Sequence, residues 1–195
     1  MADVDWITVG SGFVGALLGA GATLLGVTLQ MRSNDNTEKK KDAARHAAVL
    51  QALHDELETI KVVYMSTAGG IIQNHAASDP FIYYWPVSGD YFSVYHGHVG
   101  VLGYIQDDAL RKALIQTYTY AKGLLDSFRL NNIFVERYEI AAKLHLRAPS
   151  EDHQNALTIA QDQLRLYAPT LVQSHQRLVA AVDSCLQQLR TAGAV

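Results

Sequence analysis

The chain opens with a long run of residues that carry no charge. From residue 6 to residue 31, 26 consecutive residues are apolar, small or uncharged polar. At about 1.5 Å per residue, this run forms a helix of roughly 39 Å, longer than a hydrocarbon core of about 30 Å. We therefore predict a transmembrane anchor at residues 1–31, with its spanning helix at 6–29.

Beyond a polar and basic linker predicted at residues 32–41, apolar residues recur with helical spacing. One apolar face runs from His46 to Tyr64, a second from Leu110 to His145 and a third from Leu157 to Leu189. Alternating steps of four and three residues are typical of helices that pack along a heptad seam. The pattern predicts helices at about 38–66, 107–146 and 151–190.

The signals at the helix ends agree with these boundaries. Asp107 or Asp108 is suited to the N-cap of the first long helix and Ser150 to that of the second, and Ala148-Pro149-Ser150 separates the two helices by a short turn. Long helices joined so closely form an antiparallel hairpin. The predicted fold class is all-α: a transmembrane helix, then an elongated antiparallel bundle at residues 42–195 made of the hairpin and a third helix. Asn131, a polar residue in the seam, is expected to set helix register rather than perform chemistry.

An aromatic-rich segment connects the helix predicted at about 38–66 to the hairpin. Residues 81–104 hold eight of the seventeen aromatic residues, and Asp90 is a candidate cap for a short helix reaching about Gly103. Aromatic rings with hydroxyl groups suit a pocket for a planar ligand or a hot spot for a protein partner. The alternative is that they only fill space between the helices. The candidate binding residues are Tyr84, Trp85, Tyr91 and Tyr95.

The glycines of the N-terminal run allow two interpretations. Residues 10–15 match G-x-G-x-x-G after a stretch that could be a strand, as in dinucleotide-binding proteins. Residues 16–25, however, lack the solvated face that such a helix needs, and no further βαβ pattern follows. Small residues four apart also let membrane helices approach closely. We favour a membrane helix over a nucleotide site. Its glycines either serve close packing, with Gly12, Gly15 and Gly19 as the packing candidates, or are simply common in membrane helices.

Charge sets the expected topology and excludes one class of partner. Basic residues appear only after the apolar run, which predicts an outside N-terminus and a cytoplasmic C-terminal domain in a single-pass inner-membrane protein. Beyond Lys41 there are twelve Lys and Arg against fifteen Asp and Glu, so nucleic acid is not an expected partner. The single cysteine, Cys185, excludes an intramolecular disulfide.

Candidate chemistry is sparse. His96 and His98 suggest a metal site, but two histidines two apart on a helix point in different directions, and no recognised third ligand follows. There is no P-loop or G-x-S-x-G motif, and carboxylates such as Glu56 and Glu58 are expected on a solvated helix face. We predict no metal, no cofactor and no enzymatic activity.

The order of these features resembles a group of bacterial membrane proteins. A Gly-rich apolar segment and basic flank precede a helix, Tyr-Phe-x-Val-Tyr at residues 91–95, Val-Gly-Val-Leu-Gly at 99–103 and Tyr-Thr-Tyr-Ala-Lys-Gly at 118–123. This order resembles N-terminally anchored, single-pass inner-membrane proteins with helical cytoplasmic domains. The resemblance implies a bacterial inner-membrane location and no particular activity.

Two hypotheses about function follow. The first is a non-enzymatic protein, anchored in the lipid bilayer, that acts by homo-oligomerisation or by binding another protein. The second is a ligand-sensing membrane effector, for example a defence protein, with an aromatic pocket in residues 81–104.

Overall fold

The structure is a computed structural model that describes the backbone of residues 6–89 and 91–194. Side chains are described for the same residues except 6–29 and 32–36. The chain divides into two compact units, Met1–His46 and Ala47–Val195. Helix α1, Trp6–Tyr64, begins in the first unit and ends in the second, and residues 32–41, predicted as a linker, are helical within it.

The second unit is helical throughout its regular structure, as the hydrophobic spacing predicts. After α1 come a π-helical turn, η1 at Met65–Gly69, and the short helix α2, Gly70–Gln73. Helix α1 ends at Tyr64 and the backbone leaves helical geometry at Thr67, close to the end predicted for the helix at about 38–66. Helix α3 is Ser93–Leu102, and the hairpin helices are α4, Asp108–Arg147, and α5, Glu151–Thr191.

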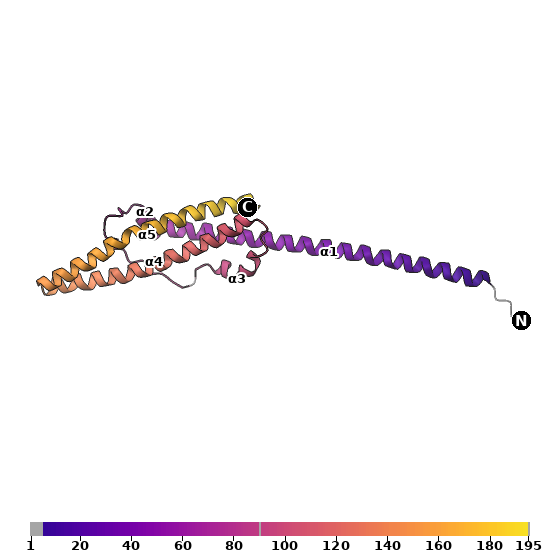
Figure 1. Ribbon diagram of the computed structural model, residues 1–195, viewed down its shortest axis with the longest axis horizontal. Coiled ribbons are helices and arrows are strands. Elements are labelled where there is room, and N and C mark those ends of the chain that lie inside the picture. Colours follow the sequence, from indigo (N-terminus) through magenta and orange to yellow (C-terminus); the bar gives the residue numbers. More distant parts are fainter. Residues whose placement is uncertain (1–5, 90, 195) are drawn as a thin grey trace. The chain divides into compact units, whose positions relative to one another are not determined.

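The predicted hairpin is confirmed, together with both of its caps. The Asp107 side chain accepts hydrogen bonds from the amides of Ala109 and Leu110 at 2.8 and 3.1 Å. Ser150 accepts one from the amide of His153 at 3.2 Å. Figure 1 shows α4 and α5 side by side along their length, with the part of α1 that belongs to this unit beside them. Capping satisfies amides that have no partner inside the helix, which explains why both helices start where they do.

The core follows the predicted seams. Leu53 and Leu57 of α1, Leu114 of α4, and Leu171 and Leu189 of α5 are all at most 2% exposed. Two ion pairs at the rim of this core join α1 to α5: Lys61 with Asp183, and Glu58 with Arg190 at 3.2 Å. Three helices therefore share one core in the half of the hairpin that α1 reaches.

Candidate functional site

The aromatic segment lies against α4 in an extended conformation. Asn131 donates a hydrogen bond to the Tyr83 carbonyl at 2.9 Å. Asn132 accepts one from the Trp85 amide at 3.1 Å and donates one to the Trp85 carbonyl at 2.6 Å. Both asparagines are buried. Because a non-helical segment needs partners for its buried backbone groups, this pair of amide side chains fixes the course of the segment on α4.

The four aromatic candidates separate into three environments. Trp85 and Tyr91 line a cavity. Tyr84 is 50% exposed and does not line it. Tyr95 instead stacks on Tyr118, with ring centroids 3.8 Å apart and planes 23° from parallel. The structure therefore brings only two of the four candidates together.

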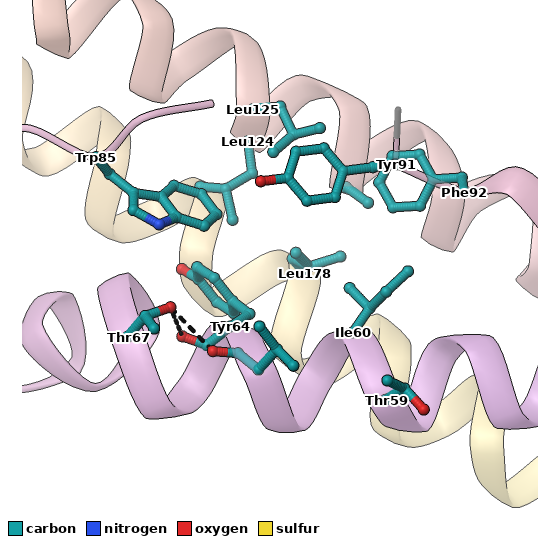
Figure 2. Close-up of a pocket in the computed structure, with 12 residues that line it drawn as sticks. Thr59, Ile60, Tyr64, Thr67, Trp85, Tyr91, Phe92, Leu124, Leu125 and Leu178 are labelled. Carbon is teal, nitrogen blue, oxygen red and sulfur yellow. Dashed lines mark hydrogen bonds between the residues drawn. The ribbon is translucent and has the colours of Figure 1, made fainter. Parts of the chain in front are cut away.

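The cavity, of about 330 Å³, lies between α1, α4, α5 and the aromatic segment. Figure 2 shows the rings of Trp85, Tyr91 and Phe92 above the α1 residues Ile60 and Tyr64. The other lining residues come from the three long helices and from η1: Thr59 and Val63 of α1, Thr67 of η1, Ala121, Leu124 and Leu125 of α4, and Leu178 of α5. No lining side chain carries a formal charge, so the wall is suited to apolar matter.

Two polar side chains of the cavity wall, Thr67 and Tyr64, already have hydrogen-bond partners. The Thr67 hydroxyl donates to the carbonyl oxygens of Val63 and Tyr64, at 2.9 and 3.1 Å. The Tyr64 hydroxyl is hydrogen bonded to Nδ1 of His175 at 2.7 Å. Among the described residues, no hydrogen bond is recorded for the Tyr91 hydroxyl, which points toward Leu124 in Figure 2. That hydroxyl is one polar group of the wall that is able to orient a molecule in the cavity.

The Tyr64–His175 pair has the electrostatics of a structural contact. Burial raises the pKa of Tyr64 above its usual range and lowers the pKa of His175 below its usual value. Both shifts favour the neutral forms, because a charge is poorly solvated at this depth. The hydrogen bond between the two side chains therefore joins α1 to α5.

Phe92 forms one edge of the cavity in an uncommon backbone conformation. Its φ of 69° and ψ of 41° are left-handed, which is rare for a bulky residue and costs on the order of 1–3 kcal/mol. The ring is 8% exposed and meets the ring of Tyr118 edge-on, at a centroid distance of 5.5 Å. Burial and the contacts of Val94 and Tyr95, which follow shortly after Phe92, therefore hold this conformation in place.

Those contacts come from Glu56 of α1. Its carboxylate accepts hydrogen bonds from the amides of Val94 at 2.7 Å and Tyr95 at 3.1 Å, both in the first turn of α3. It also accepts one from the Tyr118 hydroxyl at 2.8 Å. Burial, then the nearby charge of Glu56, raises the pKa of Tyr118 and keeps this hydroxyl protonated.

Glu56 corrects two expectations from the sequence. We expected this carboxylate on a solvated face and Asp90 as the cap of the short helix. The helix begins only at Ser93, with Phe92 at the N-cap position and no side-chain cap of its own, and Asp90 lies outside the described residues. A carboxylate from another helix supplies the acceptor. Negative charge is favourable there because the N-terminus of a helix carries a partial positive charge.

The remaining candidates are not assembled into a site. Nδ1 of His98 is hydrogen bonded to the Val94 carbonyl at 2.8 Å, and His96 meets the Phe92 ring edge-on. Within the part of the chain whose side chains are placed, no three His, Cys, Asp or Glu side chains gather where a metal ion could be held. Cys185 is buried, and burial raises the pKa of its thiol to about 11.

The membrane candidates fall where the structure gives no side chains. Gly12, Gly15 and Gly19, like the predicted spanning helix at residues 6–29, lie outside the described side chains. Among the residues whose side chains are described, no helix is both long and apolar enough to cross a membrane.

Sequence reasoning missed four residues that shape the site. Asn132 and His175 left a usable signal, because each is a polar residue beside buried seam positions, where it needs a partner. Glu56 and Phe92 carry no such sequence signal, since their roles depend on where α3 begins.

Comparisons with known proteins find no matching family model, no matching curated protein and no matching solved structure.

Proposed function

We propose that this protein is a membrane-anchored, non-enzymatic helical module that senses an uncharged, mainly apolar small molecule. The observation that carries the proposal is the cavity between α1, α4, α5 and the aromatic segment. Its volume of about 330 Å³ is at the lower end of the range for small-molecule sites. The cavity favours the ligand-sensing alternative among the functions expected from the sequence.

The composition of the wall supports the choice of ligand class. A charged ligand would lose its hydration without gaining an opposite charge, which is costly in apolar surroundings. Flat aromatic molecules suit the rings of Trp85 and Tyr91, because offset and edge-on ring contacts are favourable. The Tyr91 hydroxyl would supply one orienting hydrogen bond.

The membrane part of the proposal rests on the sequence alone. The uncharged run at residues 6–31 is followed by Arg32 and three consecutive lysines at 39–41. This asymmetry supports a single-pass protein in the bacterial inner membrane with the helical unit in the cytoplasm. Membrane fractionation followed by protease treatment of intact spheroplasts tests it. The unit containing α4 and α5 is expected to be protected from the protease, and its digestion would indicate the opposite orientation.

Ligand binding is tested on the full-length protein in detergent micelles. The probe is 2-naphthol, and 2-naphthoate serves as its charged counterpart of similar shape. At a ligand concentration ten times the dissociation constant, binding adds about 1.4 kcal/mol, which raises the melting temperature by roughly 3–6 °C in a chain of this size. Circular dichroism at 222 nm follows the melting of the helices. We expect the shift with 2-naphthol and not with 2-naphthoate.

Two tyrosines of the aromatic segment provide a matched pair of variants. Tyr91→Ala removes a lining ring and is expected to abolish the shift with 2-naphthol. Tyr84→Ala removes a ring that is half exposed and outside the cavity, so the shift should remain. Equal shifts in the two variants, or an equal response to both probes, would refute the proposed pocket.

A further inference from the structure

The outer face of α4 carries an apolar stripe that the proposed ligand pocket does not use. Leu130, Ile133, Ile140 and Leu144 are 39, 46, 60 and 47% exposed. They lie in the half of the hairpin beyond the three-helix core, and Arg137 occupies the one remaining position of the stripe. Single exposed apolar residues are ordinary, but a regular row of them on one helix marks a contact surface.

The spacing of the stripe is that of a coiled-coil seam. From Leu130 to Leu144 the steps are three, four, three and four residues, which place these side chains at the two core positions of a heptad. The seam faces away from α5: Ile133 stands two residues from both Asn131 and Val135, and two residues correspond to about 200° around a helix. Both Asn131 and Val135 are buried toward the core.

The charges beside the stripe identify its occupant. Glu136 and Lys143 are seven residues apart, so they flank the same edge of the stripe. Two copies of α4 related by a twofold axis run antiparallel, and this edge of one copy then faces the same edge of the other. Glu136 of each copy meets Lys143 of the other, while Ile133 lies opposite Leu144. In a parallel pair, these charges would face the opposite edge, which is formed by Phe134 and Ala141.

Both charged side chains are available for this pairing. Glu136 is exposed, and no ion pair to it is recorded among the described residues. Lys143 is 66% exposed and contacts Glu139 of its own helix at 3.2 Å, a surface pair that contributes little. The opposite edge is apolar, with Phe134 packed edge-on against Tyr167 at a centroid distance of 5.4 Å.

We propose that this face of α4 is a self-association surface, on which a second copy of the chain packs antiparallel through residues 130–144. The seam spans about 21 Å of helix and contains Arg137, so its buried area falls below the roughly 1,200–2,000 Å² of a stable interface. A charged core position also favours one register at the expense of affinity. The pair is therefore weak in solution and strengthened wherever two copies are held close together.

The apolar part of the proposal is tested by co-capture of two differently tagged full-length copies in detergent micelles over a series of concentrations. Ile133→Glu should abolish the co-capture that depends on this face. Ile115→Glu is its matched control, because Ile115 lies on the same helix, is also 46% exposed and stands outside the stripe. Circular dichroism checks that both variants are folded. Equal co-capture by the two variants would overturn the proposal.

The charges provide a test of orientation that does not depend on the apolar variants. Glu136→Lys alone and Lys143→Glu alone each turn two attractive pairs into repulsive ones, and each should weaken self-association about tenfold. A copy carrying Glu136→Lys mixed with a copy carrying Lys143→Glu should associate at least as well as the unchanged chain, because both pairs are again opposite in sign. Association through another surface, such as the N-terminal segment, would be indifferent to these charges, and that result refutes the proposal.

Discussion

Removing the Glu56 carboxylate should uncap α3 and loosen the edge of the cavity. The carboxylate accepts two amide hydrogen bonds from the first turn of α3 and one hydroxyl hydrogen bond from Tyr118. Glu56→Ala removes all three hydrogen bonds at once. The matched control is Glu58→Ala, two residues along the same helix, where the side chain pairs with Arg190 at 3.2 Å and is half exposed.

The expected magnitude follows from these contacts. Losing a helix cap costs about 1 kcal/mol, and losing a hydrogen bond to a charged acceptor costs about 1.5–3 kcal/mol. The Tyr118 side chain is buried, so its hydroxyl gains little water in exchange. Glu56→Ala should therefore lower the free energy of unfolding by about 3 kcal/mol, and Glu58→Ala by less than about 1 kcal/mol. Glu56→Gln keeps one acceptor oxygen and should fall between them.

Two measurements check this reasoning. Urea unfolding of the full-length protein gives the loss of stability, and native-state hydrogen exchange reports the amides of Val94 and Tyr95. Both amides should lose protection in Glu56→Ala and keep it in Glu58→Ala. Unchanged exchange at these amides, or equal losses of stability in the two alanine variants, would show that Glu56 does not cap α3.

Three further predictions concern buried groups of the same unit. Burial lowers the pKa of His175 below 6.5, so the unfolded chain binds more protons than the folded chain. The stability that neutral His175 contributes is complete above about pH 6.5 and is lost as the pH falls below it. His175→Gln should flatten this dependence in melting curves recorded from about pH 7.5 to about pH 5. Tyr64→Phe removes the 2.7 Å hydrogen bond to His175 and should lower the urea midpoint by the equivalent of about 1–2 kcal/mol; an unchanged midpoint would contradict the buried pair. Cys185, buried with a pKa of about 11, should not react with a disulfide reagent at pH 8 until urea unfolds the protein, and rapid reaction of the native protein would contradict its burial.

Much of the second unit could be predicted because its helices are specified locally. The four–three spacing of α4 and α5, the caps Asp107 and Ser150, and the turn at Pro149 all act within a few residues of the chain. Asn131 stays within a continuous helix because its neighbours in the seam continue to pack against α5. Local spacing therefore determined the all-helical fold and the hairpin.

The site depended on contacts between distant parts of the chain. Glu56 reaches α3 across 38 residues and Tyr64 reaches His175 across 111 residues, and neither partner follows from spacing along one helix. The aromatic composition of residues 81–104 marked the segment, but only its attachment to Asn132 separates Trp85, inside the cavity, from the exposed Tyr84.

The sequence by itself determined the helices, the hairpin and the uncharged N-terminal run, because hydrophobic periodicity, capping and charge depend only on residues close together in the chain. The tertiary structure alone decided which aromatic rings line a cavity, which carboxylate caps α3 and which apolar stripe of α4 stays uncovered. All three features depend on which helices lie beside each other and on where each helix ends relative to its neighbours. Those relations exist only in the folded chain.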